Sequence, residues 1–175
     1  MFIVTTERLG LMPLSYAQAI LFTQSRNDFE TYIGLELSQF ELNAPEGFSA
    51  ELTESLNNYV IPKLKVHIEH YEWYSHWLII HLQKKLIIGG IGMNGLPNEE
   101  GEVMIGYYID KKFESQGYTT EALGELIKWI IKNPNVKSII ADTLTDGHAS
   151  QKVLKKNGFA YDTLVDEGMR WRLII

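Results

Sequence analysis

The stretch between residues 102 and 143 constrains the fold more than any other part of this chain. β-Branched and aromatic residues at 103–109 predict a strand. A polar loop at 110–117 follows, and then a helix at about 118–132. The apolar residues of this helix fall on one face, at Ala122, Leu123, Leu126, Ile127, Ile130 and Ile131. Pro134 ends the helix, and a second, buried strand is predicted at 136–141.

The loop of this unit places Gly117 directly before the predicted helix. A helix that starts after such a loop leaves its first backbone N–H groups without intrahelical acceptors, with the positive end of the helix dipole behind them. This arrangement favours a phosphate group. Loops with one glycine before a helix are also common as structural turns, so the loop alone leaves both interpretations open.

The composition predicts a single globular domain spanning residues 1–175. The chain has no cysteine, which excludes a disulfide framework and a cysteine nucleophile. Its formal net charge of -6 argues against nucleic-acid binding. No apolar run approaches the ~20 residues of a membrane span, and no signal peptide is recognisable. We therefore expect a cytoplasmic protein that binds neither nucleic acid nor a membrane.

Further strands and helices are predicted on both sides of this unit. The other strands are predicted at residues 2–11, 77–82, 86–91, 159–164 and 169–174. Helices are predicted after Ser15, at residues 49–74 and at residues 146–156. Pro62 is expected to kink or split the second helix. The last two strands are expected to form a hairpin through Asp166-Glu167-Gly168.

Three other features suggest competing interpretations. Residues 90–95 spell G-x-G-x-x-G, but the residues that follow cannot open the long helix that a dinucleotide-binding fingerprint needs. A glycine-rich strand packed against a neighbour is the better interpretation. His67 and His70 could share a helix face, but no third ligand is specified nearby, so we expect no metal site. An aromatic cluster suggests core packing or, alternatively, the wall of a substrate pocket, and comprises Tyr71, Trp73, Tyr74 and Trp77.

Three segments together resemble the GNAT superfamily of acyl-CoA N-acyltransferases, particularly its RimJ/RimL-like branch. Residues 114–123, Glu-Ser-Gln-Gly-Tyr-Thr-Thr-Glu-Ala-Leu, resemble the signature Q/R-x-x-G-x-G/A and the T-E-A-L that often follows it. Residues 150–159 resemble the second signature, a serine that opens a helix ending in Gly-Phe. Residues 6–14 resemble the opening strand of that branch. The matches occur in the family's order and cover nearly the full chain.

The resemblance implies a mixed α/β (α+β) fold with a mostly antiparallel sheet of six to seven strands, flanked by helices. It also implies a coenzyme A cleft between two central parallel strands that splay apart. The implied reaction is direct transfer of an acetyl group from acetyl-CoA to a primary amine, such as a protein N-terminus or a small-molecule amine, without a metal. A homodimer is compatible with this family. A catalytically eroded module that only binds acyl-CoA is the alternative.

The resemblance also implies roles for particular residues. The pyrophosphate of coenzyme A falls to the backbone N–H groups of Ser115, Gln116, Gly117, Tyr118, Thr119 and Thr120. The open strand near Ile109 pairs with the pantetheine arm as a pseudo-strand. Ser150 corresponds to a serine proposed to donate a proton to the departing thiolate. Its alternative role is a first-turn hydroxyl that satisfies local backbone groups.

Several positions depart from the family pattern. Glu114 replaces the usual Gln or Arg, and Ser115 and Thr119 replace small residues. Met104 occupies the strand position where many relatives carry a glutamate that helps to deprotonate the amine. Glu102 lies on the same strand face by two-residue alternation, and we assign it as the substitute base, with a chain of water molecules as the alternative. The sequence does not identify the amine acceptor.

Overall fold

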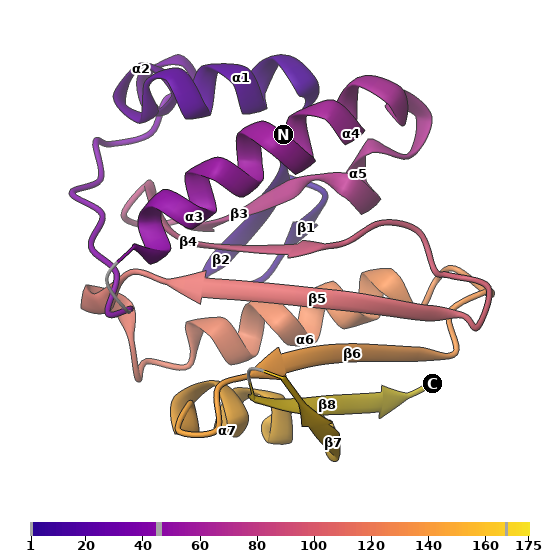
Figure 1. Cartoon of the computed structure of the whole chain (residues 1–175). Helices are drawn as coiled ribbons and strands as arrows, with labels where there is room; N and C mark the ends of the chain where they lie inside the picture. Colours follow the sequence, from indigo (N-terminus) through magenta and orange to yellow (C-terminus); the bar gives the residue numbers. More distant parts are fainter. Residues whose placement is uncertain (1, 45–46, 167) are drawn as a thin grey trace.

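The chain folds around one β-sheet with helices on both faces (Figure 1). This computed structural model describes residues 2–44, 47–166 and 168–175. Within these residues the sheet has eight strands in the order β1-β2-β3-β4-β5-β6-β8-β7. Neighbouring strands pair antiparallel, except for β5 and β6, which pair in parallel. The predicted class, a mixed and mostly antiparallel sheet flanked by helices, is confirmed.

The elements have the following bounds. The strands are β1 Val4–Thr5, β2 Leu9–Pro13, β3 His76–His81, β4 Leu86–Met93, β5 Glu102–Ile109, β6 Ser138–Thr143, β7 Ala160–Val165 and β8 Gly168–Ile174. The α-helices are α1 Tyr16–Gln24, α2 Arg26–Tyr32, α3 Phe48–Ser55, α4 Ile61–Val66, α5 Tyr71–Tyr74, α6 Tyr118–Ile130 and α7 His148–Lys156. A π-helical turn, η1, spans Leu56–Val60, and 3-10 turns are η2 Ile68–His70 and η3 Lys111–Phe113. The β7–β8 hairpin is confirmed, although Glu167 of its predicted turn lies outside the described residues.

The predicted number of six to seven strands is too low, because the first predicted strand is in fact two. The side-chain oxygen of Thr6 accepts hydrogen bonds from the backbone N–H groups of Arg8 (3.1 Å) and Leu9 (2.8 Å). These bonds fix a tight turn, and β1 folds back antiparallel onto β2. A threonine that bonds the backbone two and three residues ahead favours such a turn over a continuing strand.

The helix predicted at residues 49–74 is shorter than expected and does not break at Pro62. Helical backbone runs from Phe48 through the π-helical turn to Val66, and Pro62 lies in the first turn of α4. The N–H of Ile61 bonds the carbonyl of Leu56, five residues back. Because the π turn has already widened the helix, the proline ring and its missing N–H are accommodated without a break. The helical run ends instead at His67, whose backbone leaves the helical region.

Alternating side chains of the sheet build a separate core on each face. On β3, Trp77 and Ile79 belong to the core beneath α6 and α7, whereas Leu78 and Ile80 belong to the core beneath α1, α2 and α4. Figure 1 shows α6 behind the central strands and the N-terminal helices across the other face. Trp77 also packs against Trp129, so the core interpretation of this aromatic residue was correct. Across the described residues, no helix has the length and hydropathy to cross a bilayer.

The glycines of residues 90–95 lie in β4 and the turn that follows it, so they do not open a helix and the dinucleotide-binding interpretation is wrong. Gly90 is required for close packing. A Cβ atom there would lie 2.4 Å from the ring of His76 and 2.7 Å from the ring of Tyr108.

We expect Gly90→Ala to lower the free energy of unfolding by about 2 kcal/mol, the usual size for an overpacked core. Chemical denaturation would measure this change. Gly106→Ala is the matched control on the neighbouring strand, since a Cβ there meets nothing within 4 Å, and it should change stability by less than about 0.5 kcal/mol. Equal stabilities of the two variants would contradict the packing argument.

Candidate functional site

Strands β5 and β6 separate after a short paired segment. β6 pairs with β5 only over residues 102–104, whereas β5 pairs with β4 over residues 105–109. Within the part of the chain that the structure describes, the β5 edge that faces β6 therefore has no strand partner from Ile105 onward. Free main-chain groups on a strand edge can bind an extended ligand through backbone hydrogen bonds. The predicted splay of two central parallel strands is present.

The loop after β5 leads into α6 with its backbone N–H groups free. Ser115 and Gly117 have left-handed backbone, with φ of 59° and 81°, and no side chain caps the helix. The N–H groups from Ser115 to Thr120 donate to no acceptor among the described residues. Six consecutive free donors at the positive end of a helix form a cradle for an anion.

The structure brings together all seven residues that were predicted to bind a cofactor. Ile109 ends β5, and the other six form the loop and the first turn of α6. Ser115, Gln116 and Gly117 are exposed, and Thr119 and Thr120 are half-buried. The side chain of Tyr118 is instead buried, and its hydroxyl lies 3.1 Å from Nε2 of His81. Tyr118 can therefore offer only its backbone N–H to a ligand in this loop.

Glu114 directly precedes these donors in the sequence. Its carboxylate accepts a hydrogen bond of 3.4 Å from the side-chain amide of Asn43, in the segment between α2 and α3. This contact holds the negative charge on the side of the loop that faces that segment. The first part of the loop is fixed by buried Asp110, which accepts hydrogen bonds from the backbone of Lys112 (2.8 Å) and Glu41 (3.3 Å).

Ser150 lies in the first turn of α7 and faces β5. Its Oγ lies 2.8 Å from the hydroxyl of Tyr107, which is also 3.1 Å from the carbonyl oxygen of Ser150. Burial raises the pKa of Tyr107 to about 12, although the bond to Ser150 opposes this. The phenol is therefore protonated at neutral pH and can act as a donor to Ser150. Sequence reasoning missed Tyr107, which lies on the β5 segment that β6 leaves unpaired.

Glu102 does not join this group. It begins β5 at the paired end, and seven residues of strand, ~23 Å, separate it from Ile109. Its carboxylate lies 2.5 Å from the guanidinium of Arg172 in an ion pair. Arg172 also donates to Ser138 and Asp162. The ion pair holds this carboxylate against β8, at the end of β5 that pairs with β6.

The opposite face of β5 carries a second pair of polar side chains. The hydroxyl of Tyr108 lies 2.8 Å from Nε2 of His76, and the two rings stack. Burial, with a smaller contribution from the charge of Arg26, lowers the pKa of His76 to about 4. The imidazole is therefore neutral near pH 7. Gly106 is exposed, and a Cβ atom there would meet nothing within 4 Å, so β5 is open at this position.

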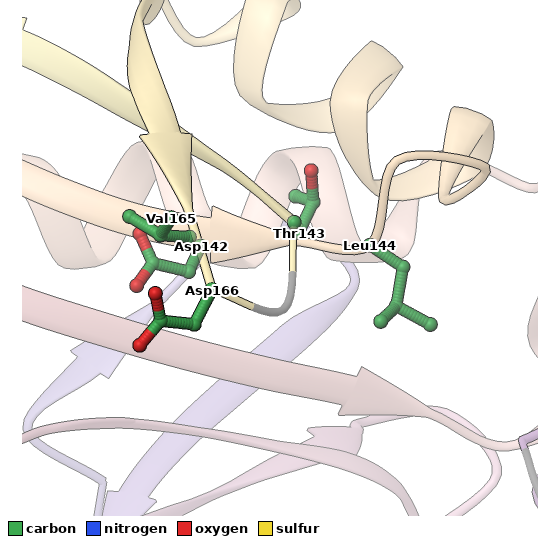
Figure 2. Close-up of a pocket in the computed structure, with 6 residues that line it drawn as sticks. Asp142, Thr143, Leu144, Val165 and Asp166 are labelled. Atoms are coloured by element: carbon green, nitrogen blue, oxygen red, sulfur yellow. The ribbon is translucent and has the colours of Figure 1, made fainter.

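A pocket of about 390 Å³ lies at the end of β6 and the β7–β8 hairpin. Figure 2 shows Asp142 and Asp166 directed to the same side of it. Asp142 already forms two hydrogen bonds of 2.8 Å with Arg170. The pocket contains none of the predicted site residues.

Among the described residues, no three His, Cys, Asp or Glu side chains gather as metal ligands, and His67 stacks on Tyr74.

Comparison with known proteins identifies related sequences. A family model described as "Acetyltransferase (GNAT) domain" matches residues 8–160. The Bacillus subtilis (strain 168) protein named "Uncharacterized N-acetyltransferase YjdG" is 34% identical over 98 residues, which is 56% of this chain. The match spans only 58% of the length of that relative.

Comparison with solved structures shows the same fold. RimL, a ribosomal L7/L12 alpha-N-protein acetyltransferase solved in complex with coenzyme A, matches with a TM-score of 0.66 at 15% identity. The match covers 100% of this chain and 98% of that structure. A Salmonella typhimurium acetyl transferase that modifies the N-terminal serine of L7/L12 matches with a TM-score of 0.64 at 16% identity. It covers 100% of this chain and 99% of that structure.

Proposed function

Because the chain belongs to the GNAT acetyltransferase family, we propose that it transfers an acetyl group from acetyl-CoA to a primary amine. One observation carries this proposal: the unpaired edge of β5 leads directly into a loop with six free N–H groups. The combination offers a strand edge for an extended arm and a cradle for a diphosphate at its end. The strand edge would bind the pantetheine arm of coenzyme A, and the loop would bind its diphosphate.

The loop supplies the anion site of the proposal. The N–H groups of Ser115 to Thr120 would hold the pyrophosphate, helped by the dipole of α6. Backbone donors do not depend on side-chain identity, so the replacements at Ser115 and Thr119 leave this chemistry intact. The backbone near Ile109 would pair with the pantetheine arm and direct the thioester toward Tyr107 and Gly106.

Ser150 and Tyr107 would act on the leaving group. The neutral amine attacks the thioester carbonyl and a C–N bond forms. The nitrogen then loses a second proton to water while the C–S bond breaks, and the sulfur leaves as a thiolate. Ser150 would donate its hydroxyl proton to this thiolate, the phenol of Tyr107, 2.8 Å away, would replace that proton, and Tyr107 would recover a proton from solvent. The protonated state of Tyr107 at neutral pH suits this role.

The ammonium group must lose a proton before it attacks. Glu102 and a chain of water molecules are the two acceptors that the sequence predicts. The ion pair with Arg172 favours water over Glu102. His76 lies nearer to Gly106, but with a pKa of about 4 it is a weak base. We therefore propose that water removes the proton, which is lost to solvent above the open strand.

We expect Glu102→Gln to change turnover by less than about twofold and to leave the pH profile of kcat unchanged, because the carboxylate is held in a structural ion pair. Stability should fall by up to about 1 kcal/mol, since Arg172 keeps Asp162 as a partner. Steady-state kinetics between pH 6 and 9 would measure the first effect and thermal unfolding the second. Loss of the ascending limb of the pH profile would restore Glu102 as the base.

The test of the proposed function combines binding and turnover. Calorimetry with coenzyme A measures the cofactor site, and thiol release from acetyl-CoA with a panel of amines measures transfer. Binding with turnover on at least one amine supports the enzyme. Binding without turnover on any amine would favour the eroded acyl-CoA-binding module, an alternative that Met104 at the usual glutamate position supports. Absence of binding would overturn both.

The proposal also covers the extent of the domain, the acceptor, the assembly and the compartment. We propose one domain over residues 1–175, a protein N-terminus or a small-molecule amine as acceptor, and a homodimer as the assembly. The absence of cysteine fits a reducing compartment such as the cytoplasm. Light scattering at several concentrations would test the dimer. Competition between N-terminal peptides and small amines would rank the acceptors.

A further inference from the structure

Arg8 reaches from the turn before β2 to the loop that starts α6. Its Nε donates to Glu121 Oε2 at 2.8 Å, and its Nη1 donates to the carbonyl oxygen of Gln116 at 3.3 Å. Its guanidinium carbon lies 4.3 Å from the centre of the Tyr118 ring. Arg8 is therefore far from α6 in the sequence, but its side chain contacts both the loop and the first turn of that helix.

Glu121 fixes Arg8 in this position. The hydroxyl of Thr6 donates to the second carboxylate oxygen of Glu121, at 2.5 Å. Burial alone would raise the pKa of Glu121, but the hydrogen bonds from Thr6 and Arg8 outweigh it and lower the pKa. The carboxylate is therefore ionised at neutral pH, and the turn between β1 and β2 is tied to the first turn of α6.

The contact with Gln116 determines how the next peptide group points. The peptide between Gln116 and Gly117 is trans, so its carbonyl and its N–H point in opposite directions. Because the carbonyl points to Arg8, the N–H of Gly117 points away from Arg8, where it meets no acceptor among the described residues. Gly117 itself imposes no such preference, since glycine adopts positive and negative φ with similar ease. An anchor outside the loop is needed to select one orientation.

We propose that Arg8 is a positioning residue for the coenzyme A loop, which holds the Gln116–Gly117 peptide with its N–H directed at the pyrophosphate. This inference rests on the proposed function. The opening segment and the Thr-Glu-Ala-Leu segment meet in this contact, because Arg8 of the first and Glu121 of the second form one ion pair. The guanidinium has enough donors to bond the carboxylate and the carbonyl at the same time.

The test compares three variants by calorimetry with coenzyme A. Arg8→Gln should weaken binding about tenfold, the size expected for one lost hydrogen bond to a charged group. Arg8→Lys keeps the charge and can still pair with Glu121, but a single ammonium cannot reach both partners, so it should keep the melting temperature and still lose affinity. Lys128→Gln removes a positive charge from α6, where Lys128 contacts Glu125 instead of the loop, and should bind like the wild type.

Steady-state kinetics distinguish a positioning role of Arg8 from a purely structural one. The Arg8 variants should raise KM for acetyl-CoA about tenfold and leave kcat within about twofold, because the loop holds the cofactor and does not act on the thioester. A wild-type chain that fails to bind coenzyme A would overturn the proposed function itself. If the wild type binds and both Arg8 variants bind equally well, Arg8 serves stability alone. Full affinity in Arg8→Lys would show that charge matters and peptide orientation does not, which would also overturn the inference.

Discussion

Replacement of Gly117 with aspartate should abolish coenzyme A binding while the protein stays folded. Gly117 has φ of 81° and ψ of 0° at the start of α6, and aspartate tolerates this left-handed region better than most residues. A Cβ there meets only the guanidinium of Arg8, at 3.7 Å, so the fold has room for the side chain. The new carboxylate would lie among the free N–H groups and repel the pyrophosphate. We expect affinity to fall by more than about 100-fold.

Gly117→Asn is the matched control for this variant. Asparagine has nearly the same shape and the same tolerance for positive φ, but it carries no charge. It should weaken binding only a few fold by calorimetry, and the far-UV circular dichroism of both variants should match the wild type. If Asn and Asp weaken binding equally, the side chain blocks the loop by size. If neither weakens it, the loop does not hold the pyrophosphate.

The parts of the fold that sequence predicted best are those set by local chemistry. The helix from Tyr118 was predicted with its start correct and its end two residues too late, because its apolar face repeats every three to four residues and Pro134 follows it. The position of the free N–H groups followed from the glycine before that helix. The split of the first strand was missed because it depends on one side chain: Thr6 bonds the backbone of Arg8 and Leu9. Alternation of side chains alone cannot show such a turn.

The residues that sequence reasoning missed act across long distances in the chain. Tyr107 and Ser150 are 43 residues apart, and Arg8 and Glu121 are 113 residues apart. Tyr107 looked like an ordinary strand residue because its partner lies on α7, and no local pattern links the two. Glu102 shows the same dependence on a distant partner. Strand alternation placed it on the same face as Met104, but its partner Arg172 comes from β8, which the alternation of β5 could not reveal.

Ser150→Ala should lower kcat by about 100-fold and leave the affinity for coenzyme A within about twofold, because the hydroxyl acts on the departing thiolate and not on the bound cofactor. Tyr107→Phe removes only the phenol oxygen that lies 2.8 Å from Ser150 Oγ. It should lower kcat by about tenfold, since Ser150 then lacks its proton source and its orienting partner. The pH profile of kcat should stay unchanged between pH 6 and 9, because a pKa of about 12 keeps the phenol protonated throughout.

The double variant that combines Ser150→Ala with Tyr107→Phe distinguishes a proton relay from two independent contributions to kcat. If Tyr107 acts through Ser150, Tyr107→Phe has nothing further to remove once Ser150 is alanine, so the double variant should turn over as slowly as Ser150→Ala alone. Independent roles would multiply the two effects, to about 1,000-fold. Full activity in Ser150→Ala would instead return the serine to a structural role in the first turn of α7. In that case the contact with Tyr107 would serve only to pack α7 against β5, and thermal unfolding of Tyr107→Phe would show a loss of about 1 kcal/mol.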